Sequence, residues 1–386
     1  MVSVLFLLLQ SAAMVPPNAA AIDDDGTITV TATQLPDLAA QAEACAKQLC
    51  PTRKDIAVTV AYASALFDEG NYRDAKRLLA GAVTRTRDAA KAEPIAVSTL
   101  YQAQATLASH EGDQDIVRDA TWASANVLRE GLPDNSLPQL TAELRLADWQ
   151  LRTGDKTGAI ARYADIAARA AAAGHGAIGD VASLRRAVTV ESTGRTSEAM
   201  ALLDSLAARP GADAAELRRA ALSTAARLAT RAGRTQQADA YVALLAAEPG
   251  GAEPVLISSA ELPRPGRPDT APFLDGVGLD RGARGSDLAG LRWVDIGYRI
   301  LPDGRVADIR FVRGSARLAW AQPLLGYIGS RRYTPFAGSD GVHRVERYTL
   351  TADYMVPSGS LIRRRLRNPR FEVMPMTVSA AAETGH

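Results

Sequence analysis

Five glycines recur between residues 70 and 233 at nearly equal intervals of 42, 42, 40 and 39 residues. Each follows an alanine-rich stretch with the periodicity of a helix. A glycine ends a helix readily, because it adopts the left-handed backbone conformation at little cost. The period therefore predicts a stack of helical hairpins, one around each of these residues: Gly70, Gly112, Gly154, Gly194 and Gly233.

Small residues at fixed distances from these glycines mark where the two helices of a hairpin approach each other. An alanine lies seven positions before each glycine, and four of the five glycines precede an alanine five positions later. Apolar residues at helical spacing lie between them. In the first unit the pattern consists of Tyr62, Ala63, Leu66, Gly70, Tyr72, Ala75, Leu79 and Ala82.

This pattern resembles that of the tetratricopeptide repeat family, and later units repeat it less completely. The resemblance covers residues 52–248, in units longer than those of the family. It implies an α-solenoid of helical hairpins whose concave face is available to protein partners. The alternative is an alanine-rich helical bundle, because hairpins with glycine in the turn also occur there. In either fold, Arg185-Arg186 and Arg218-Arg219 are expected on solvated helix faces.

The first 21 residues have the features of a secretory signal peptide. An apolar run at residues 4–9 is followed by three alanines at 19–21 and then by acidic residues, which is typical of such signals. The run is too short to span a bilayer, which takes ~20 apolar residues. We expect cleavage after Ala21, with residues 22–51 as a lead segment and first helix. Because no Lys or Arg precedes the run, an uncleaved anchor is the alternative.

The chain has two cysteines, Cys45 and Cys50, and export to an oxidising compartment favours a disulfide between them. In a continuous α-helix, residues five apart are separated by ~7.5 Å along the axis and face different directions, which is beyond disulfide reach. Pro51 moves Cys50 out of helical geometry and lets the chain fold back. A disulfide and a pair of buried thiols therefore remain as two alternatives. A zinc site is not expected, because it would need a second pair of ligands.

The composition changes after residue 248. Six prolines and many glycines follow, so residues 249–291 are interpreted as a linker, in which 255–258 have the composition of one short strand. Beyond the linker, apolar and polar residues alternate as in strands, and an Asp-Gly turn separates the first two runs. This pattern predicts three strands and, from its helical periodicity, one helix: 293–300, 306–312 and 344–355, and 316–331.

This order of elements, with Arg-Tyr-x-Pro after the helix, resembles the C-terminal domain of the TonB energy-transducer family. The matching residues are Ile300, Asp303, Gly304, Val306, Asp308, Ile309, Arg332, Tyr333 and Pro335. The resemblance implies a small α+β domain over residues 292–357. Members of the family add an extended segment of a partner to the edge of their sheet.

By this resemblance, the last strand of the domain is the edge at which a partner docks. Its alternation is equally typical of a strand that only packs the core of the domain. An exposed edge would also permit a homodimer. The predicted partner-binding residues are Arg347, Tyr348, Leu350, Ala352 and Tyr354.

Residues 358–386 are expected to form a basic, flexible tail. An arginine cluster in this tail would attract anionic headgroups or cell-wall polymers, unless the tail is simply solvated. Nucleic acid is not expected as a partner, because its binding needs a wider basic surface and an aromatic platform. The arginines of this cluster are Arg363, Arg364, Arg365 and Arg367.

The chain as a whole is predicted to be mainly α, an α-solenoid followed by a small α+β domain. It has no G-x-S-x-G motif and no metal-ligand spacing, and its four histidines are scattered. We therefore expect no enzyme, and no catalytic, cofactor-binding or metal-binding residues. The predicted function is a periplasmic protein-interaction scaffold whose TonB-like domain docks an envelope protein by strand addition. The alternative is an inner-membrane-anchored TonB-type transducer that serves outer-membrane receptor transport.

Overall fold

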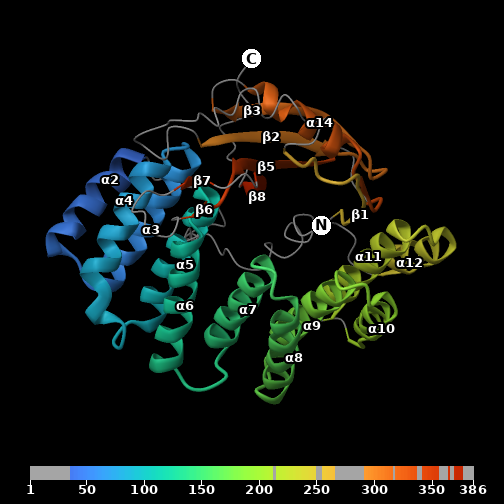
Figure 1. Ribbon diagram of the computed structural model, residues 1–386, viewed down its shortest axis with the longest axis horizontal. Helices are drawn as coiled ribbons and strands as arrows, with labels where there is room; N and C mark the ends of the chain where they lie inside the picture. Colours follow the sequence, from blue (N-terminus) through green and yellow to red (C-terminus); the bar gives the residue numbers. More distant parts are fainter. Residues whose placement is uncertain are drawn as a thin grey trace, which may run out of the picture.

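The computed structural model describes residues 35–211, 214–248, 254–265, 291–315, 318–336, 341–355, 364–365 and 369–376. The predicted signal peptide and most of the predicted linker lie outside these ranges, as do Arg363 and Arg367. Within them the protein is mainly α-helical, with a small antiparallel sheet near its C-terminus (Figure 1). No helix of the described residues is long and apolar enough to cross a membrane.

After helix α2 (Leu35–Ala44), ten helices pack as antiparallel hairpins in a curved row, which we call the helical arc (Figure 1). Each helix contacts its neighbours in the chain. The pairs are α3 (Thr52–Asp68) with α4 (Tyr72–Thr86), α5 (Pro94–Glu111) with α6 (Gln114–Gly131), α7 (Leu137–Arg152) with α8 (Lys156–Ala172), α9 (Gly176–Glu191) with α10 (Thr196–Ala207), and α11 (Ala215–Arg231) with α12 (Thr235–Ala247).

Glycine occupies the turn inside each of these hairpins. The left-handed conformation predicted for the five periodic glycines is confirmed, with φ angles between 70° and 95°. The alanines around the glycines lie where the helices meet, and small side chains there allow close packing. Eight of these alanines are buried: Ala63, Ala75, Ala147, Ala159, Ala187, Ala199, Ala226 and Ala238.

Four antiparallel strands form the C-terminal sheet, in the order β3-β2-β5-β8. One face of the sheet packs against helix α14 (Gln322–Gly329) and the preceding 3₁₀ turn Leu318–Ala321, and apolar side chains of both layers form a single core. The strands are β2 (Arg292–Ile300), β3 (Val306–Gly314), β5 (Val342–Thr351) and β8 (Arg370–Met376).

Strand β8 lies within the segment predicted to be a flexible tail, so that prediction is wrong for residues 370–376, and the sheet extends beyond residue 357. The physical reason is a short apolar alternation after the arginine cluster. Phe371 and Val373 both point into the core of the sheet, and their burial offsets the entropy of ordering the segment. Ahead of β8, a two-residue strand β7 (Arg364–Arg365) pairs with β6 (Tyr354–Met355).

Part of the predicted linker is also ordered. Strand β1 (Leu256–Ser258) pairs with β4 (Arg332–Tyr333), and Ile257 packs against the core around helix α11. The two-stranded sheet of β1 and β4 thus contacts the last hairpin through β1, while strand β5 of the C-terminal sheet contacts α5 near the other end of the arc. In Figure 1 the sheet accordingly lies across the open side of the helical arc.

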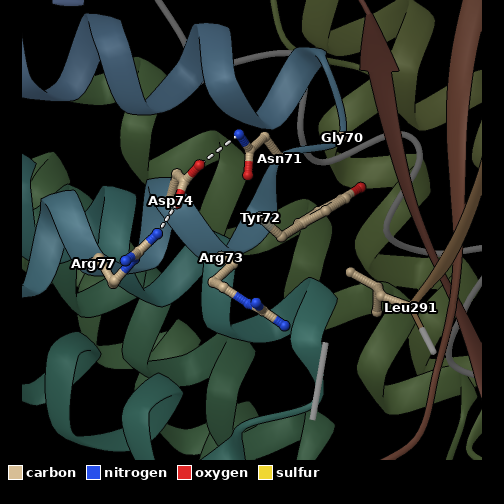
Figure 2. A pocket seen from close by; sticks show the side chains of 7 residues that line it. All are labelled: Gly70, Asn71, Tyr72, Arg73, Asp74, Arg77 and Leu291. Carbon is tan, nitrogen blue, oxygen red and sulfur yellow. Dashed lines mark hydrogen bonds and ion pairs between the residues drawn. The ribbon is translucent and has the colours of Figure 1, made fainter. Parts of the chain in front are cut away.

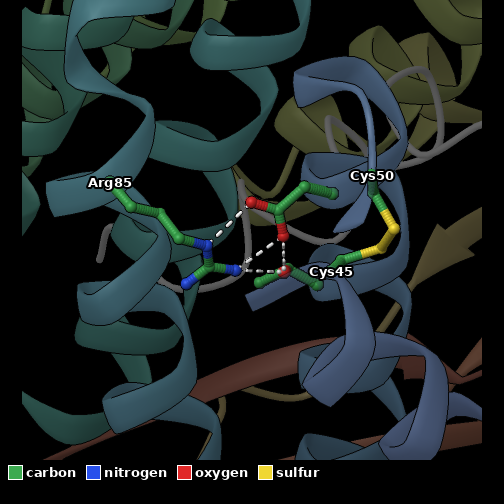
Figure 3. The surroundings of a disulfide bond; sticks show 5 residues. Cys45, Cys50 and Arg85 are labelled. Carbon is green, nitrogen blue, oxygen red and sulfur yellow. Dashed lines mark hydrogen bonds and ion pairs between the residues drawn. A yellow bond between two sulfur atoms is a disulfide. The ribbon is translucent and has the colours of Figure 1, made fainter. Parts of the chain in front are cut away.

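A disulfide joins Cys45 to Cys50, with their Cα atoms 4.8 Å apart (Figure 3). The chain between them forms a π-helical turn, Cys45–Leu49, and Cys50 is extended. A π-helical turn has more residues than an α-helical turn, so residues five apart come to lie above each other. The bridge fastens α2 beside α3, where Asp55 binds Arg85 of α4 through two hydrogen bonds.

Candidate functional site

Strand β5 carries most of the predicted docking residues and lies inside the sheet. It pairs with β2 along one edge and with β8 along the other. The prediction that it is an exposed edge is therefore wrong, because the chain's own C-terminal strand satisfies the backbone groups of that edge. The predicted residues Arg347, Tyr348, Leu350 and Ala352 are all buried, and Tyr354 is half-buried.

The two faces of β5 have different neighbours. Tyr348 faces α14, where its hydroxyl donates to Glu346 at 2.6 Å. Arg331 donates to both oxygens of the same carboxylate, at 2.8 and 2.9 Å. Burial raises the pKa of Glu346, but Arg331 and the hydrogen bonds outweigh it, so the net pKa lies below the usual value. These buried hydrogen bonds join β5 to Arg331, which follows α14 in the chain, and so hold α14 against the sheet.

Arg347 faces the other way, toward the helical arc, and is 0% exposed. Its guanidinium forms a bidentate ion pair with Asp295 of β2, in which Nε and Nη2 donate to the two carboxylate oxygens at 2.7 and 2.8 Å. It also donates to the carbonyl oxygens of Phe67 and Asp68, the second at 2.7 Å. These carbonyls end helix α3, where the helix dipole favours a cation. One side chain therefore joins the sheet to the first hairpin of the arc.

Trp293 lies beside this arginine and completes the contact with the first hairpin. The guanidinium carbon of Arg347 lies 4.0 Å from the centroid of the indole. The indole also lies close to Gly70, where a Cβ atom would lie 2.4 Å from Cζ2 of Trp293. Gly70 therefore has two reasons to be glycine: its positive φ and the close approach of this ring.

The second hairpin contacts the sheet through the turn at Gly112. Nδ1 of His110 lies 2.9 Å from Oγ1 of Thr349, and the backbone N–H of Tyr354 donates to the carbonyl of Gly112 at 3.2 Å. A Cβ atom at Gly112 would lie 2.2 Å from the carbonyl oxygen of Ala352. We call this contact and those of Trp293 and Arg347 the docking interface.

His110 is buried in the docking interface and is neutral at physiological pH. Its pKa is lowered to about 4, chiefly by burial; Glu372 of β8 acts in the opposite direction, and the nearby Arg347 and Arg152 add to the lowering. Arg152 of α7 lies 3.8 Å from Glu372. Sequence reasoning missed this histidine, because nothing near it in the chain indicates that a strand some 240 residues later covers it.

A pocket of about 370 Å³ lies at the margin of the docking interface (Figure 2). The turn after α3 and the beginning of α4 form most of it, and Leu291 closes it from the side of the sheet. Asp74 in this pocket accepts hydrogen bonds from Asn71 and Arg77, so its carboxylate is already engaged. No group of three or more His, Cys, Asp or Glu that could bind a metal occurs in the described part of the chain.

A second pocket, of about 290 Å³, lies between helices α6, α7 and α8. Its lining residues lie toward the helix ends that are far from the Gly112 and Gly154 turns. The pocket is therefore away from the docking interface. We call it the outer pocket. Its charged and aromatic lining residues are Trp122, Arg129, Glu143, Arg162, Asp165 and Arg169.

No protein-family model matches the sequence, and no curated protein does. Among solved structures, the crystal structure of BtubC (BKLC) from P. vanneervenii is similar, with 19% sequence identity and a TM-score of 0.46. The similarity covers 61% of this chain and 98% of that one. At this level the similarity supports no conclusion about function.

Proposed function

We propose that the protein is an exported protein-interaction scaffold. In this proposal the helical arc is a tetratricopeptide-like solenoid that binds partners, and the C-terminal sheet is a TonB-like domain that packs against the arc. The observation that carries the proposal is the docking interface, in which Arg347 and Asp295 are buried together against the end of α3. A buried charge pair of this kind requires a fixed geometry, which suits a permanent contact.

The edges of the sheet support binding through the arc rather than by strand addition. Strands β3 and β8 are the two outer strands, and neither outer edge pairs with another described strand. Strand β3 contains register shifts, and Asp308 within it has a positive φ of 53°. Strand β8 contains Pro375, which cannot donate a backbone hydrogen bond. Bulges and prolines are features by which proteins protect sheet edges from pairing.

Photo-crosslinking in cells distinguishes the two binding modes. A photoreactive amino acid is placed at Ile95 or Leu244, which are exposed on the arc, or at Val312, which is exposed on β3. We expect crosslinks to a partner protein from the arc positions and none from Val312. Crosslinks from Val312 alone would instead support strand addition to β3. Absence of a partner at all three positions would contradict a scaffold.

A further inference from the structure

The outer pocket contains more positive charge than its own acidic residues neutralise. Arg169 binds both acidic residues of the pocket: it donates to Asp165 at 2.9 Å and to both oxygens of Glu143. These carboxylates outweigh the effect of burial, so the pKa of Arg169 is raised. Arg169 and its two partners thus account for both negative charges in the pocket.

Two other arginines line the same pocket without such partners. Arg129 donates to the amide oxygen of Asn126 at 2.7 Å, and Arg162 donates to that of Gln150 at 2.8 Å. Neither has a carboxylate within ion-pair distance among the residues that the structure describes. Each uses one N–H group on a neutral acceptor, and a guanidinium has five. Donors therefore remain for an anionic ligand.

Trp122 of α6 adds an aromatic surface beside these arginines. It is 37% exposed, in a chain with only four tryptophans. Tryptophan and arginine are among the residue types that contribute most of the binding energy in protein interfaces. The guanidinium group also matches the two oxygens of a carboxylate.

We propose that the outer pocket binds an acidic peptide segment of a partner protein. A carboxylate of the peptide binds Arg129 and Arg162, and an adjacent apolar side chain lies on Trp122. Trp122 offers an exposed apolar surface to a neighbouring side chain of a peptide, which a free phosphate lacks, and this favours a peptide as the ligand. This assignment rests on the proposed scaffold function and names the class of its partner.

Isothermal titration calorimetry with the full chain tests the proposal. The probe is the blocked peptide Gly-Ser-Asp-Leu-Asp-Ser-Gly, and the control probe has Asn in place of both Asp residues. We expect binding of the acidic peptide only, and about a tenfold loss of affinity in Arg162→Gln, as for one charge-assisted hydrogen-bonded pair. Arg118→Gln is the matched control, because Arg118 is on α6 outside the pocket and pairs with Asp115 and Asp119.

Several outcomes would overturn this assignment. Equal binding of the two peptides, or binding of neither, would exclude an acidic-peptide site. An equal loss in Arg118→Gln would show a general charge effect, and displacement of the peptide by an equal concentration of inorganic phosphate would show a simple anion site. Crosslinks from Ile95 and Leu244 that persist unchanged in Arg162→Gln would then leave the scaffold standing while this pocket assignment fails.

Discussion

Arg347 shows how much of the domain arrangement depends on one side chain. Its guanidinium satisfies Asp295 within the sheet and two carbonyl groups at the end of α3, and it lies over the indole of Trp293. Arg313 also donates to Asp295, at 2.8 Å. Because Arg347 and Asp295 are both buried, the loss of Asp295 leaves the charge of Arg347 where water cannot reach it.

We predict that Asp295→Asn destabilises the protein by about 3–5 kcal/mol, the range for a buried ion pair that loses one member. The substitution keeps the shape of the side chain but leaves Arg347 and Arg313 facing a neutral amide. Urea unfolding followed by circular dichroism measures the change. Asp303→Asn is the control, because Asp303 pairs with Arg305 in an exposed turn. An equal shift of the unfolding midpoint in both variants would contradict a special role for the buried pair.

At the scale of elements, local patterns predicted the hairpins and the first strands. The glycine period placed the turns of the arc, and the Asp-Gly turn placed β2 and β3. The sequence could not show what covers the polar face of the sheet. Asp295 and Arg347 alternate with apolar residues as on a solvated face, yet their partner is the distant end of α3. For the same reason Arg185, expected in solvent, is buried beside Asp148.

Strand β8 was missed because its apolar alternation is short and follows a run of arginines. Phe371 of this strand is 4% exposed and stacks on Trp320, with the ring centroids 6.1 Å apart. We predict that Phe371→Ala costs about 3–5 kcal/mol of unfolding free energy, because it empties a packed aromatic site. Leu244→Ala, at a 56% exposed position, is the control and should change the midpoint little. A neutral Phe371→Ala would mean that residues 370–376 behave as a tail.

At the scale of the whole molecule, the C-terminal strands contact two distant parts of the arc, and the two contacts differ in chemistry. Toward α11 the contact is apolar, with Ile257 packed on the core of that hairpin. Toward α3 and α5 it contains a buried ion pair and the neutral His110. Acid therefore acts on one contact and not on the other, so we expect the arc and sheet to separate at the docking interface first.

The last prediction follows from the pKa of His110, which is lowered from 6.5 to about 4 in the folded protein. Between these values the unfolded chain binds a proton that the folded chain does not, so stability falls as the pH falls from about 6.5 to about 4. The full shift corresponds to about 3 kcal/mol. At pH 4.5 we expect a larger radius of gyration by small-angle X-ray scattering than at pH 7. His110→Asn, which stays neutral and keeps a polar group near Thr349, should expand less over this range; equal expansion in both proteins would assign the acid response to other groups.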